Sequence, residues 1–430
     1  MKAFLLHILV FLAGKVIKKY QPTIIGITGS VGKTSAKEAI THILASQIDV
    51  RASEKNFNTE IGVSLVIIGI DQSPGRSLGK WISVCIRALR LLYVRDPRYP
   101  RILILEMGAD RPGDISTLTT LAPCSIGLLT AIGPAHLEKF GTMEALVNEK
   151  KEMIRHLAPR STAIVNADDP FLYPLNEKLR ARLITFGFAE YADLRADSFV
   201  EQYVFLPQEQ VSMSMSFECS YADQLTHCEL HHSIGKQAVY ATLAALAAAC
   251  ALGIPLQQAV GDMRSYKGLK GRMKLLQGMK QTLIIDDSYN SSPLAAFEAL
   301  GALEKIRIHE YAKRIAVFGD MLELGTFTQA EHRKLGELCA QKNVDILVTI
   351  GPAAKWIAES AAEHGIDTSR ILRFDRSEEA REVLVNIMKQ GDVILVKGSQ
   401  GMRLEKLIKE ILAEPLQASE LLVRQGREWT

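Results

Sequence analysis

The 430-residue sequence lacks a marked excess of charge of either sign. Its 51 lysine and arginine residues are nearly balanced by 48 aspartate and glutamate residues, which leaves a formal net charge of +3. Acids and bases are interspersed, so the chain has no broad positive field of the kind that attracts nucleic acid. The composition therefore argues against a nucleic-acid partner.

Cysteine is sparse, and its spacing does not indicate a metal clamp. No C-x-x-C pair occurs, and six cysteines are too few in a chain of this length for a secreted disulfide framework. We expect reduced thiols that mostly pack in the interior, at Cys85, Cys124, Cys219, Cys228, Cys250 and Cys339.

Long apolar runs are missing as well. A membrane-spanning helix needs about 20 apolar residues, and the run at residues 3–14 (AFLLHILVFLAG) is shorter and is followed by lysines. No small-residue cleavage site comes next, which disfavours a signal peptide. We expect residues 1–20 to form an apolar and basic helix that either packs on the protein or lies at a membrane surface as a peripheral anchor, or contacts a protein partner.

Residues 81–93 (WISVCIRALRLLY) form a second candidate for membrane contact. Apolar residues surround Arg87 and Arg90 in a pattern that fits an amphipathic helix. Core packing explains such a segment more often than lipid contact, and we interpret it in that way.

What the sequence does contain is an alternation of short apolar runs with helical stretches. This alternation predicts a doubly wound α/β sheet. The buried-strand candidates of the first part lie at residues 22–27, 101–105, 126–130 and 162–165. Residues 191–232 then alternate between apolar and polar side chains, as an antiparallel β-rich edge would, and the alanine-rich residues 238–252 predict a helix that packs on this sheet.

A second α/β unit follows the first. Its strand candidates lie at residues 282–285, 315–318, 346–350 and 393–396. We place the boundary near residue 270, because this second unit begins after Gly271. The chain contains no low-complexity tract or repeat of solenoid length, so we expect the linker to be short and ordered. The sequence predicts a central P-loop-type domain over residues 21–270 and a Rossmann-like C-terminal domain over residues 271–430, facing each other across a cleft.

A glycine-containing loop lies between the first strand and the first helix of the central domain. Glycines let backbone N–H groups approach phosphate, and the helix N-terminus adds a favourable partial charge. The pattern departs from G-x-x-x-x-G-K-[ST], because Ile27 stands at the first glycine. The strand, loop and helix context nevertheless indicates a nucleotide-binding site at Thr28, Gly29, Ser30, Val31, Gly32, Lys33, Thr34 and Ser35.

This loop is one of a series of segments that occur in the order found in the Mur ligases: TGSVGKTS, NFNTEIGVSL, EMGADRPGDI, AHLEKFGT, NADD, DDSYNSSP, FGDMLELG and VKGSQGM. The chain resembles this family from about residue 23 to residue 407. The resemblance implies a cytoplasmic, ATP- and Mg²⁺-dependent ligase that joins a small-molecule carboxylate to an amine through an acyl-phosphate. The segments are most similar to the family members that add D-alanyl-D-alanine to UDP-N-acetylmuramoyl-tripeptide in peptidoglycan synthesis.

The same resemblance assigns roles to individual residues. Lys33 would reach the β- and γ-phosphates, and the Thr34 hydroxyl would lie on Mg²⁺. Glu106 and His136 resemble further Mg²⁺ ligands, and Lys150 resembles a lysine that many members carry as a carbamate, which would bind a second metal ion.

Other residues are matched at the junction and in the second domain. Arg272 resembles an arginine that stabilises charge during phosphoryl transfer. Asp287, Tyr289 and Asn290 match a segment that touches the nucleotide, with Asp286 as an alternative to Asp287. The resemblance leaves open whether Asn56 and Asn58 hold the substrate or the loop.

Two departures from the family pattern bear on substrate and base. The phosphate loop begins after only 27 residues, so we expect the family's usual UDP-sugar-binding domain to be missing. In GKQA (residues 235–238) and at Ala241, alanines and a glutamine stand where the family has histidine and asparagine. Loss of one neutral hydrogen bond costs about 1 kcal/mol, so we still expect an active enzyme.

Two alternatives stay open. The first is a ligase with another carboxylate or amine, like the folylpolyglutamate and cyanophycin ligases, which DDSYNSSP and GDMLELG disfavour. The second is a catalytically weakened ATP-binding subunit of a cell-wall assembly, which the presence of Lys33, Glu106, His136 and Lys150 disfavours.

Overall fold

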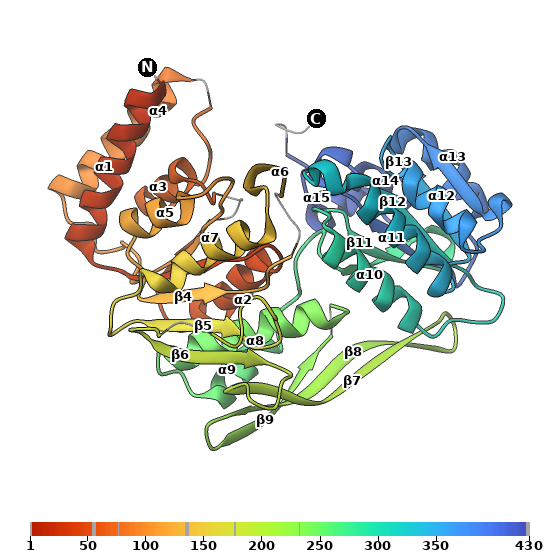
Figure 1. Cartoon of the computed structure of the whole chain (residues 1–430), viewed down its shortest axis with the longest axis horizontal. Coiled ribbons are helices and arrows are strands. Elements are labelled where there is room, and N and C mark those ends of the chain that lie inside the picture. The colour runs from red at the N-terminus through yellow and green to blue at the C-terminus, as the bar shows by residue number, and fades with distance from the viewer. Residues whose placement is uncertain are drawn as a thin grey trace.

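The computed structural model describes residues 2–53, 57–75, 77–133, 137–175, 178–231 and 233–426. The described chain forms two α/β units that lie side by side (Figure 1). Each unit is built on its own sheet, which confirms the fold class expected from the alternation of strands and helices. The boundary placed near residue 270 stays a prediction; it falls between the last helix of the first unit and the first strand of the second.

The first sheet has nine strands among the described residues, in the order β2-β3-β1-β4-β5-β6-β7-β8-β9. Strands β1 to β6 pair in parallel, and β7 joins β6 in parallel, whereas β8 pairs antiparallel with both β7 and β9. The β-rich edge is therefore confirmed as an extension of the same sheet. The strands are β1 (Thr23–Thr28), β2 (Val50–Ala52), β3 (Ile102–Glu106), β4 (Ile126–Leu129), β5 (Thr162–Asn166), β6 (Arg182–Gly187), β7 (Leu194–Leu206), β8 (Gln210–Tyr221) and β9 (Gln224–Leu230).

Helices cover both faces of this sheet because its central strands are apolar on both sides. Ile25 and Ile27 of β1 pack into one core cluster with α2 and α8, while Ile24 packs into a second cluster on the opposite face. The helices that accompany this sheet are α2 (Lys33–Ala45), α3 (Glu60–Ile68), α5 (Asp114–Leu121), α7 (Met143–Arg155), α8 (Lys236–Ala251) and α9 (Leu256–Met263), and the short α6 (Leu137–Phe140) contacts α7. The alanine-rich α8 packs on β4, β5 and β6, as predicted.

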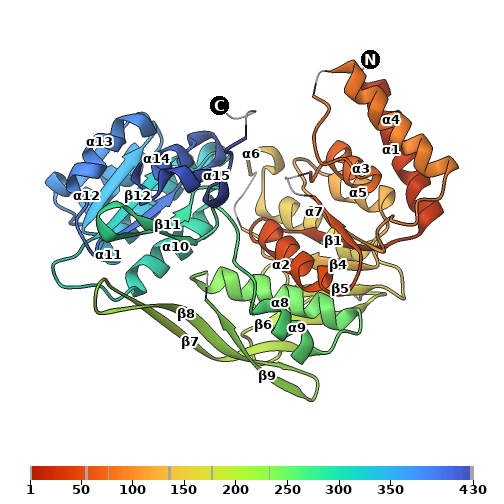
Figure 2. The ribbon, with the colours of Figure 1, turned by 180° about the vertical axis from the view of Figure 1, so that it is seen from behind.

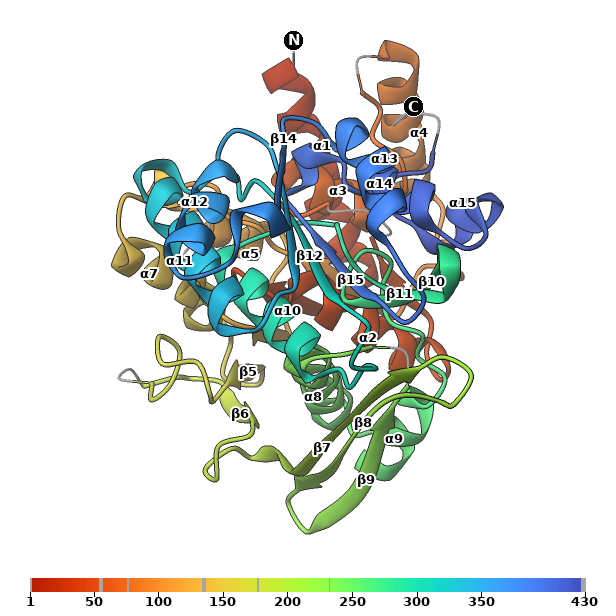
Figure 3. The same cartoon turned by 90° about the vertical axis from the view of Figure 1, so that its right-hand side faces the viewer.

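The second sheet has six strands among the described residues, in the order β10-β11-β15-β12-β13-β14, and only β10 runs antiparallel to its neighbour. Its strands are β10 (Lys274–Gly278), β11 (Thr282–Asp287), β12 (Arg314–Gly319), β13 (Ile346–Ile350), β14 (Ile371–Phe374) and β15 (Val393–Lys397). Its helices are α10 (Pro293–Lys305), α11 (Thr328–Gln341), α12 (Lys355–Glu363), α13 (Ser377–Ile387), α14 (Glu405–Ile411) and α15 (Ala418–Leu421). Figure 3 shows the molecule with this second unit facing the viewer.

The β-rich edge also touches the second unit. The backbone N–H of Arg307 donates to the carbonyl of Tyr203 at 2.8 Å, and the N–H of Phe205 donates to the carbonyl of Arg307 at 2.9 Å. One core cluster runs from the α2 and α8 side of the first sheet into the second unit. The two units are thus packed together as well as linked in sequence.

Helices α1 (Lys2–Tyr20) and α4 (Leu78–Tyr93) lie side by side at the far end of the first unit (Figures 1 and 2). Their C-terminal ends meet, because Lys19 Nζ donates to the carbonyls of Leu91 and Leu92 at 2.9 Å. Among the residues described, none of the helices is both long and apolar enough to cross a membrane. All six cysteines are free thiols, and four of them are buried, as expected.

Candidate active site

The glycine-containing loop joins the end of β1 to the first turn of α2. Gly29 must be glycine, because a Cβ there would lie 2.1 Å from Thr130 Oγ1. Gly32 has φ of 88° and directly precedes α2, a conformation that glycine adopts without steric cost. The Ser30 N–H donates to the Ala131 carbonyl at 2.7 Å, so the loop is held against the segment that follows β4.

Lys33 lies at the N-terminus of α2 and folds back over the loop. Its Nζ donates to the carbonyls of Gly29 at 2.7 Å and Ser30 at 3.3 Å. Burial lowers the pKa of Lys33; Glu106 opposes the shift and Arg272 adds to it. The amine is therefore close enough to both charged groups to interact with them.

A chain of hydrogen bonds crosses from the second unit to the first. Arg272 Nη2 donates to Thr34 Oγ1 at 3.4 Å, and Thr34 Oγ1 donates to Glu106 Oε2 at 3.0 Å. Glu106 is the last residue of β3, and its side chain is buried. Ligands of open α/β sheets bind beyond the carboxyl ends of the strands, where Glu106 lies.

A cleft of about 340 Å³ lies over this chain of hydrogen bonds. It is lined by residues from both units, including the following that the sequence singled out: Ser30, Val31, Gly32, Lys33, Thr34, Ser35, Asn58, Glu106, Arg272, Asp287, Tyr289 and Asn290. Thr28, the last residue of β1, and Gly29 are not among the residues that line the cleft, and the Thr28 hydroxyl donates to the Met107 carbonyl at 2.8 Å. His136 and Asn56 lie outside the described residues.

The cleft contains polar atoms that suit an anion. Ser30 Oγ and Arg272 Nε are buried and have no hydrogen-bond partner among the residues that the structure describes. Because a buried polar atom without a partner costs free energy, these two atoms fit a site that receives a ligand with hydrogen-bond acceptors. Together with Lys33 and the α2 N-terminus, they fit a polyphosphate.

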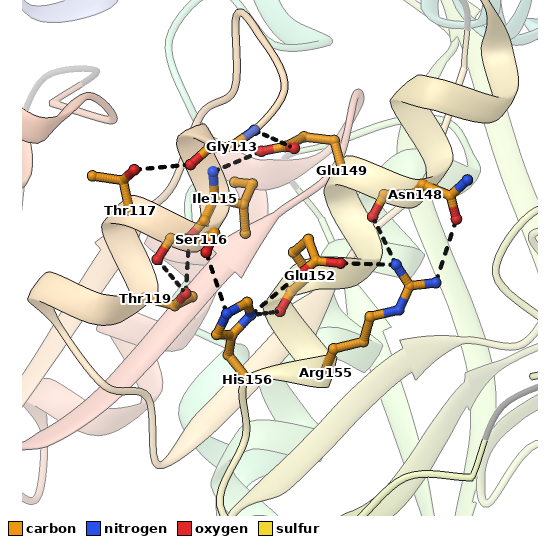
Figure 4. Close-up of polar contacts among 10 residues, drawn as sticks. All are labelled: Gly113, Ile115, Ser116, Thr117, Thr119, Asn148, Glu149, Glu152, Arg155 and His156. Atoms are coloured by element: carbon orange, nitrogen blue, oxygen red, sulfur yellow. Dashed lines mark hydrogen bonds and ion pairs between the residues drawn. The ribbon is translucent and has the colours of Figure 1, made fainter.

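Lys150 lies on α7. The residue before it, Glu149, ties this helix to the start of α5 (Figure 4). The Glu149 carboxylate accepts hydrogen bonds from the N–H groups of Gly113 at 2.8 Å and Ile115 at 2.7 Å, at the start of α5. Lys150 is 2% exposed. Burial and then the charge of Lys33 lower the pKa of Lys150 to about 7, against the opposing effect of nearby carboxylates.

A pKa of about 7 has a chemical consequence for Lys150. A large share of its side chain is an uncharged amine at neutral pH, and the uncharged amine is the form that reacts with carbon dioxide to give a carbamate. In the described part of the chain, no group of three or more His, Cys, Asp or Glu side chains forms a ready-made metal site.

The second unit contributes a loop that follows β11. Asp287 forms a buried ion pair with Lys397, with 2.5 Å between Oδ2 and Nζ, and Lys397 also donates to the Asn290 carbonyl at 3.1 Å. Two guanidinium groups lie over the Tyr289 ring, that of Arg272 at 4.4 Å and that of Arg424 at 5.2 Å from the ring centroid. These contacts fix the loop on the second-unit side of the cleft.

Asp286 and Asp287 have different surroundings. The Asp286 carboxylate accepts hydrogen bonds from the Gly271 N–H at 3.1 Å and the Ser288 hydroxyl at 2.6 Å, and burial raises the pKa of Asp286 to about 6. Asp286 therefore holds the loop to the junction, whereas Asp287 lines the cleft.

A second cavity of about 350 Å³ adjoins the phosphate loop. Phe171, Phe186 and Leu294 supply apolar walls, and the polar lining includes Asn166 and Gln237. Gln237 lines both cavities, and none of the hydrogen bonds identified among the described residues involves its side chain. Such a slot suits a flat aromatic group with a polar edge.

Sequence reasoning missed several of these residues. Lys397 belongs to VKGSQGM and Asn166 to NADD, two motifs that carried the resemblance without a role for either residue. Arg424 lies beyond the matched segments, and no sequence pattern points to it. Gln237 was noted only as a replacement, although its position between the two cavities makes it a ligand candidate.

Comparison with known proteins identifies relatives of both units. Residues 86–249 match the Mur ligase middle domain, and residues 271–400 match the Mur ligase, glutamate ligase domain. The UDP-N-acetylmuramoyl-tripeptide--D-alanyl-D-alanine ligase of Bacillus subtilis (strain 168) is 27% identical over 405 residues, which cover 94% of this chain and 79% of that protein. The ligase of the same name from Mycobacterium tuberculosis (strain H37Rv) is 28% identical over 91% of this chain and 73% of its own.

Solved structures agree with the sequence matches. The crystal structure of MurF ligase from Thermotoga maritima in complex with ADP superposes with a TM-score of 0.75 at 28% identity, covering 96% of this chain and 84% of that one. MurF from Acinetobacter baumannii gives a TM-score of 0.77 at 26% identity over 94% of this chain and 80% of its own. With both domains matched in order and the cleft between them lined by the expected residues, the chain belongs to the Mur ligase family.

Proposed function

We propose that this protein is an ATP-dependent ligase that adds D-alanyl-D-alanine, or a closely similar amine, to the carboxylate of a UDP-N-acetylmuramoyl-tripeptide-like substrate in peptidoglycan synthesis. The observation that carries the proposal is the hydrogen-bonded chain of Arg272, Thr34 and Glu106, which crosses the cleft between the two units. The names of the relatives support the choice of substrates.

The nucleotide phosphates would lie over the glycine-containing loop. Lys33 turns toward that loop, and the α2 N-terminus adds positive partial charge. Arg272 would stabilise the charge that develops on the transferred phosphoryl group, because its fixed guanidinium enters from the second unit. Asp287, Tyr289 and Asn290 would contact the nucleotide from the same side, and the second cavity would receive the base.

The residues also fit magnesium, which supplies charge neutralisation between phosphate oxygens when it is bound. Thr34 and Glu106 offer a hydroxyl and a carboxylate oxygen that already contact each other at 3.0 Å. Lys150, as a carbamate, would offer an anionic oxygen from α7 to a second ion. His136, which lies outside the described residues, is kept as a further ligand by the family resemblance alone.

The reaction that we propose has two steps. The substrate carboxylate attacks the γ-phosphorus, which gives an acyl-phosphate and ADP; the amine then attacks the acyl carbon, and the tetrahedral intermediate collapses with loss of inorganic phosphate. No side-chain nucleophile is needed, so the protein contributes position and electrostatic stabilisation. Because ATP is a cytoplasmic metabolite, we propose that the enzyme acts in the cytoplasm.

A direct assay tests this proposal. Purified protein is incubated with Mg·ATP, UDP-N-acetylmuramoyl-tripeptide and D-alanyl-D-alanine, and phosphate release and product mass are followed. We expect a product larger by one dipeptide, absent with Lys33→Ala and retained with Lys355→Ala, an exposed lysine on α12. Asn58→Ala tests the substrate role of Asn58, and a raised KM for the tripeptide substrate at unchanged KM for ATP would support that role.

Other outcomes separate the remaining candidates. Phosphate release that needs an amine and a carboxylate other than these two would keep the ligase chemistry and replace the substrates. ATP binding without turnover by any such pair would favour an ATP-binding subunit. One observation favours this second candidate: in the second cavity, which would receive the base, Ala241 offers no amide to hydrogen-bond it.

A further inference from the structure

Helix α4 carries an exposed apolar stripe along its whole length. Leu78, Ile82, Ile86, Leu89 and Tyr93 are between 42% and 85% exposed. Their spacing of three or four residues puts them on one face of the helix. The opposite face, with Val84, Ala88 and Leu91, is buried against the first unit. The interpretation of residues 81–93 as core packing is therefore right for one face only.

Helix α1, which packs beside α4, also exposes an apolar side chain. It packs through Leu9, Leu12, Ala13 and Val16, which are buried, whereas Phe11 is 62% exposed. Lys15 lies over the Phe11 ring, 5.2 Å from its centroid. We call the exposed side chains of α1 and α4 the helix-pair face.

The charge of the helix pair is of one sign. The α1 sequence contains four lysines and the α4 sequence one lysine and two arginines, and neither contains aspartate or glutamate. This contrasts with the whole chain, in which 51 basic residues stand against 48 acidic ones. Lys15, Lys18, Lys80 and Arg90 are exposed, so the helix pair presents positive charges as well as the apolar stripe.

We propose that the helix-pair face is a docking surface for an anionic phospholipid bilayer, on which the protein lies peripherally. An apolar stripe with basic side chains on its flanks is the pattern of helices that lie in a membrane interface. Each basic side chain near an anionic leaflet adds attraction, and the apolar side chains insert between the headgroups. No helix in the described residues could span the bilayer, so contact is limited to the surface.

Charge argues against a second copy of the chain as the occupant. Two copies that met through this face would bring two sets of basic side chains together with no acid from either helix, and like charges in proximity are unfavourable. Helices α1 and α4 also lie at the end of the first unit that points away from the second unit (Figures 1 and 2). Among the residues that the structure describes, neither helix contributes to the lining of the cleft, so docking leaves the cleft open. The proposal does not depend on the function proposed above.

Vesicle co-sedimentation of the full-length protein tests the proposal. Vesicles of phosphatidylcholine mixed with phosphatidylglycerol are compared with vesicles of phosphatidylcholine alone, at low and at high salt. The apolar variant is Ile82→Ser with Ile86→Ser, residues 52% and 60% exposed. The matched control is Val211→Ser with Leu225→Ser on the β-rich edge, residues 62% and 67% exposed. A charge variant, Lys80→Gln with Arg90→Gln, is paired with Arg370→Gln and Lys409→Gln.

We expect the wild type to bind anionic vesicles and to bind neutral vesicles about tenfold or more weakly, with binding reduced by salt. Both helix-pair variants should weaken binding to anionic vesicles by about tenfold or more, and both controls should match the wild type. Unchanged thermal melting would show that all variants are folded. The proposal is overturned if the wild type does not bind anionic vesicles at low salt, or if the helix-pair variants bind as tightly as the controls. It is also overturned if these substitutions abolish a concentration-dependent dimer and leave vesicle binding intact.

Discussion

The buried ion pair of Asp287 and Lys397 should hold the second-unit side of the cleft together. The two residues lie opposite each other on the parallel strands β11 and β15, and their side chains are 8% and 2% exposed. The Lys397 amine donates to Asp287 and to the Asn290 carbonyl. Burial lowers the pKa of Lys397, and the charge of Asp287 opposes that shift. The Lys397 amine therefore stays protonated in the interior because the charge of Asp287 stabilises its charged form.

Lys397→Met would leave the Asp287 carboxylate buried without its cation. Removing one member of a buried pair costs about 3–5 kcal/mol of unfolding free energy, whereas replacing both members by neutral groups is often nearly neutral. We therefore expect Lys397→Met to lose about 3–5 kcal/mol, and the double variant with Asp287→Asn to recover most of it. The asparagine keeps an acceptor for the Met273 N–H, which now donates to Asp287 at 3.2 Å.

Urea unfolding near neutral pH measures these changes. In a background with Trp81→Phe and Trp429→Phe, Trp356 on α12 is the remaining tryptophan, and its emission follows the second unit. Arg381→Met is the matched control, because the Arg381 and Glu410 pair lies in the same unit but is exposed. Breaking an exposed pair costs about 0–1 kcal/mol. The reasoning is refuted if Lys397→Met is as stable as the control, or if the double variant is as unstable as the sum of the single variants.

Three further predictions follow from the site. Lys150 has a pKa of about 7 in the folded state against 10.5 in the unfolded chain, so its charge opposes folding below about pH 7, and this cost disappears as the pH rises toward 10.5. Lys150→Met should therefore raise the free energy of unfolding above that of the wild type by about 3–5 kcal/mol at low pH and leave it unchanged at high pH. Urea unfolding across this pH range measures the difference, and a difference that stays constant with pH would contradict the prediction. Arg424→Lys removes the planar guanidinium group that lies over Tyr289 and donates to Glu405 at 2.8 Å. We expect KM for ATP to rise several-fold in steady-state assays while the circular dichroism spectrum is unchanged. An unchanged KM would show that Tyr289 does not need this contact in order to bind ATP. Gln237→Ala should weaken ATP binding about fivefold, the value of one neutral hydrogen bond, in calorimetric titration; equal affinity would exclude Gln237 as a ligand of the base.

Much of the fold could be predicted because its signals are local. The apolar run of β1, the glycines after it and the helix that follows predict one another within about two dozen residues, and the structure confirms all three. The antiparallel edge was predictable for the same reason, since alternation along β8 reports which side chains face the core. Strand order was not, because β3 pairs with β1 across an intervening stretch of the chain that carries no pairing signal.

Site residues were predictable from the sequence only where they belong to a motif. Lys33 and Glu106 come from motifs, whereas Arg424 contacts Tyr289, a residue that lines the cleft, only because the chain after α15 returns to it. The helix-pair face shows a different limit. Periodicity predicted that residues 81–93 form an amphipathic helix, but it does not say which of two apolar faces meets the core. That depends on where α1 and α3 lie, and both contact α4.

The junction between the units decides whether the cleft can work as one site. Arg272 follows the junction directly and reaches Thr34 on the first unit, so its position is set by both units. The N–H of Gly271 donates to Asp286, and the Gly271 carbonyl accepts from the Tyr289 N–H at 3.0 Å, so the junction is also tied to the nucleotide-side loop of the second unit. Because electrostatic stabilisation depends on charges that are already placed before the reaction, neither unit alone holds a complete set: the first supplies Lys33, Thr34 and Glu106, and the second supplies Arg272 and Asp287. Alignment of the two units through residues 271 and 272 is therefore part of the catalytic arrangement that we propose, and not only a connection between two folds.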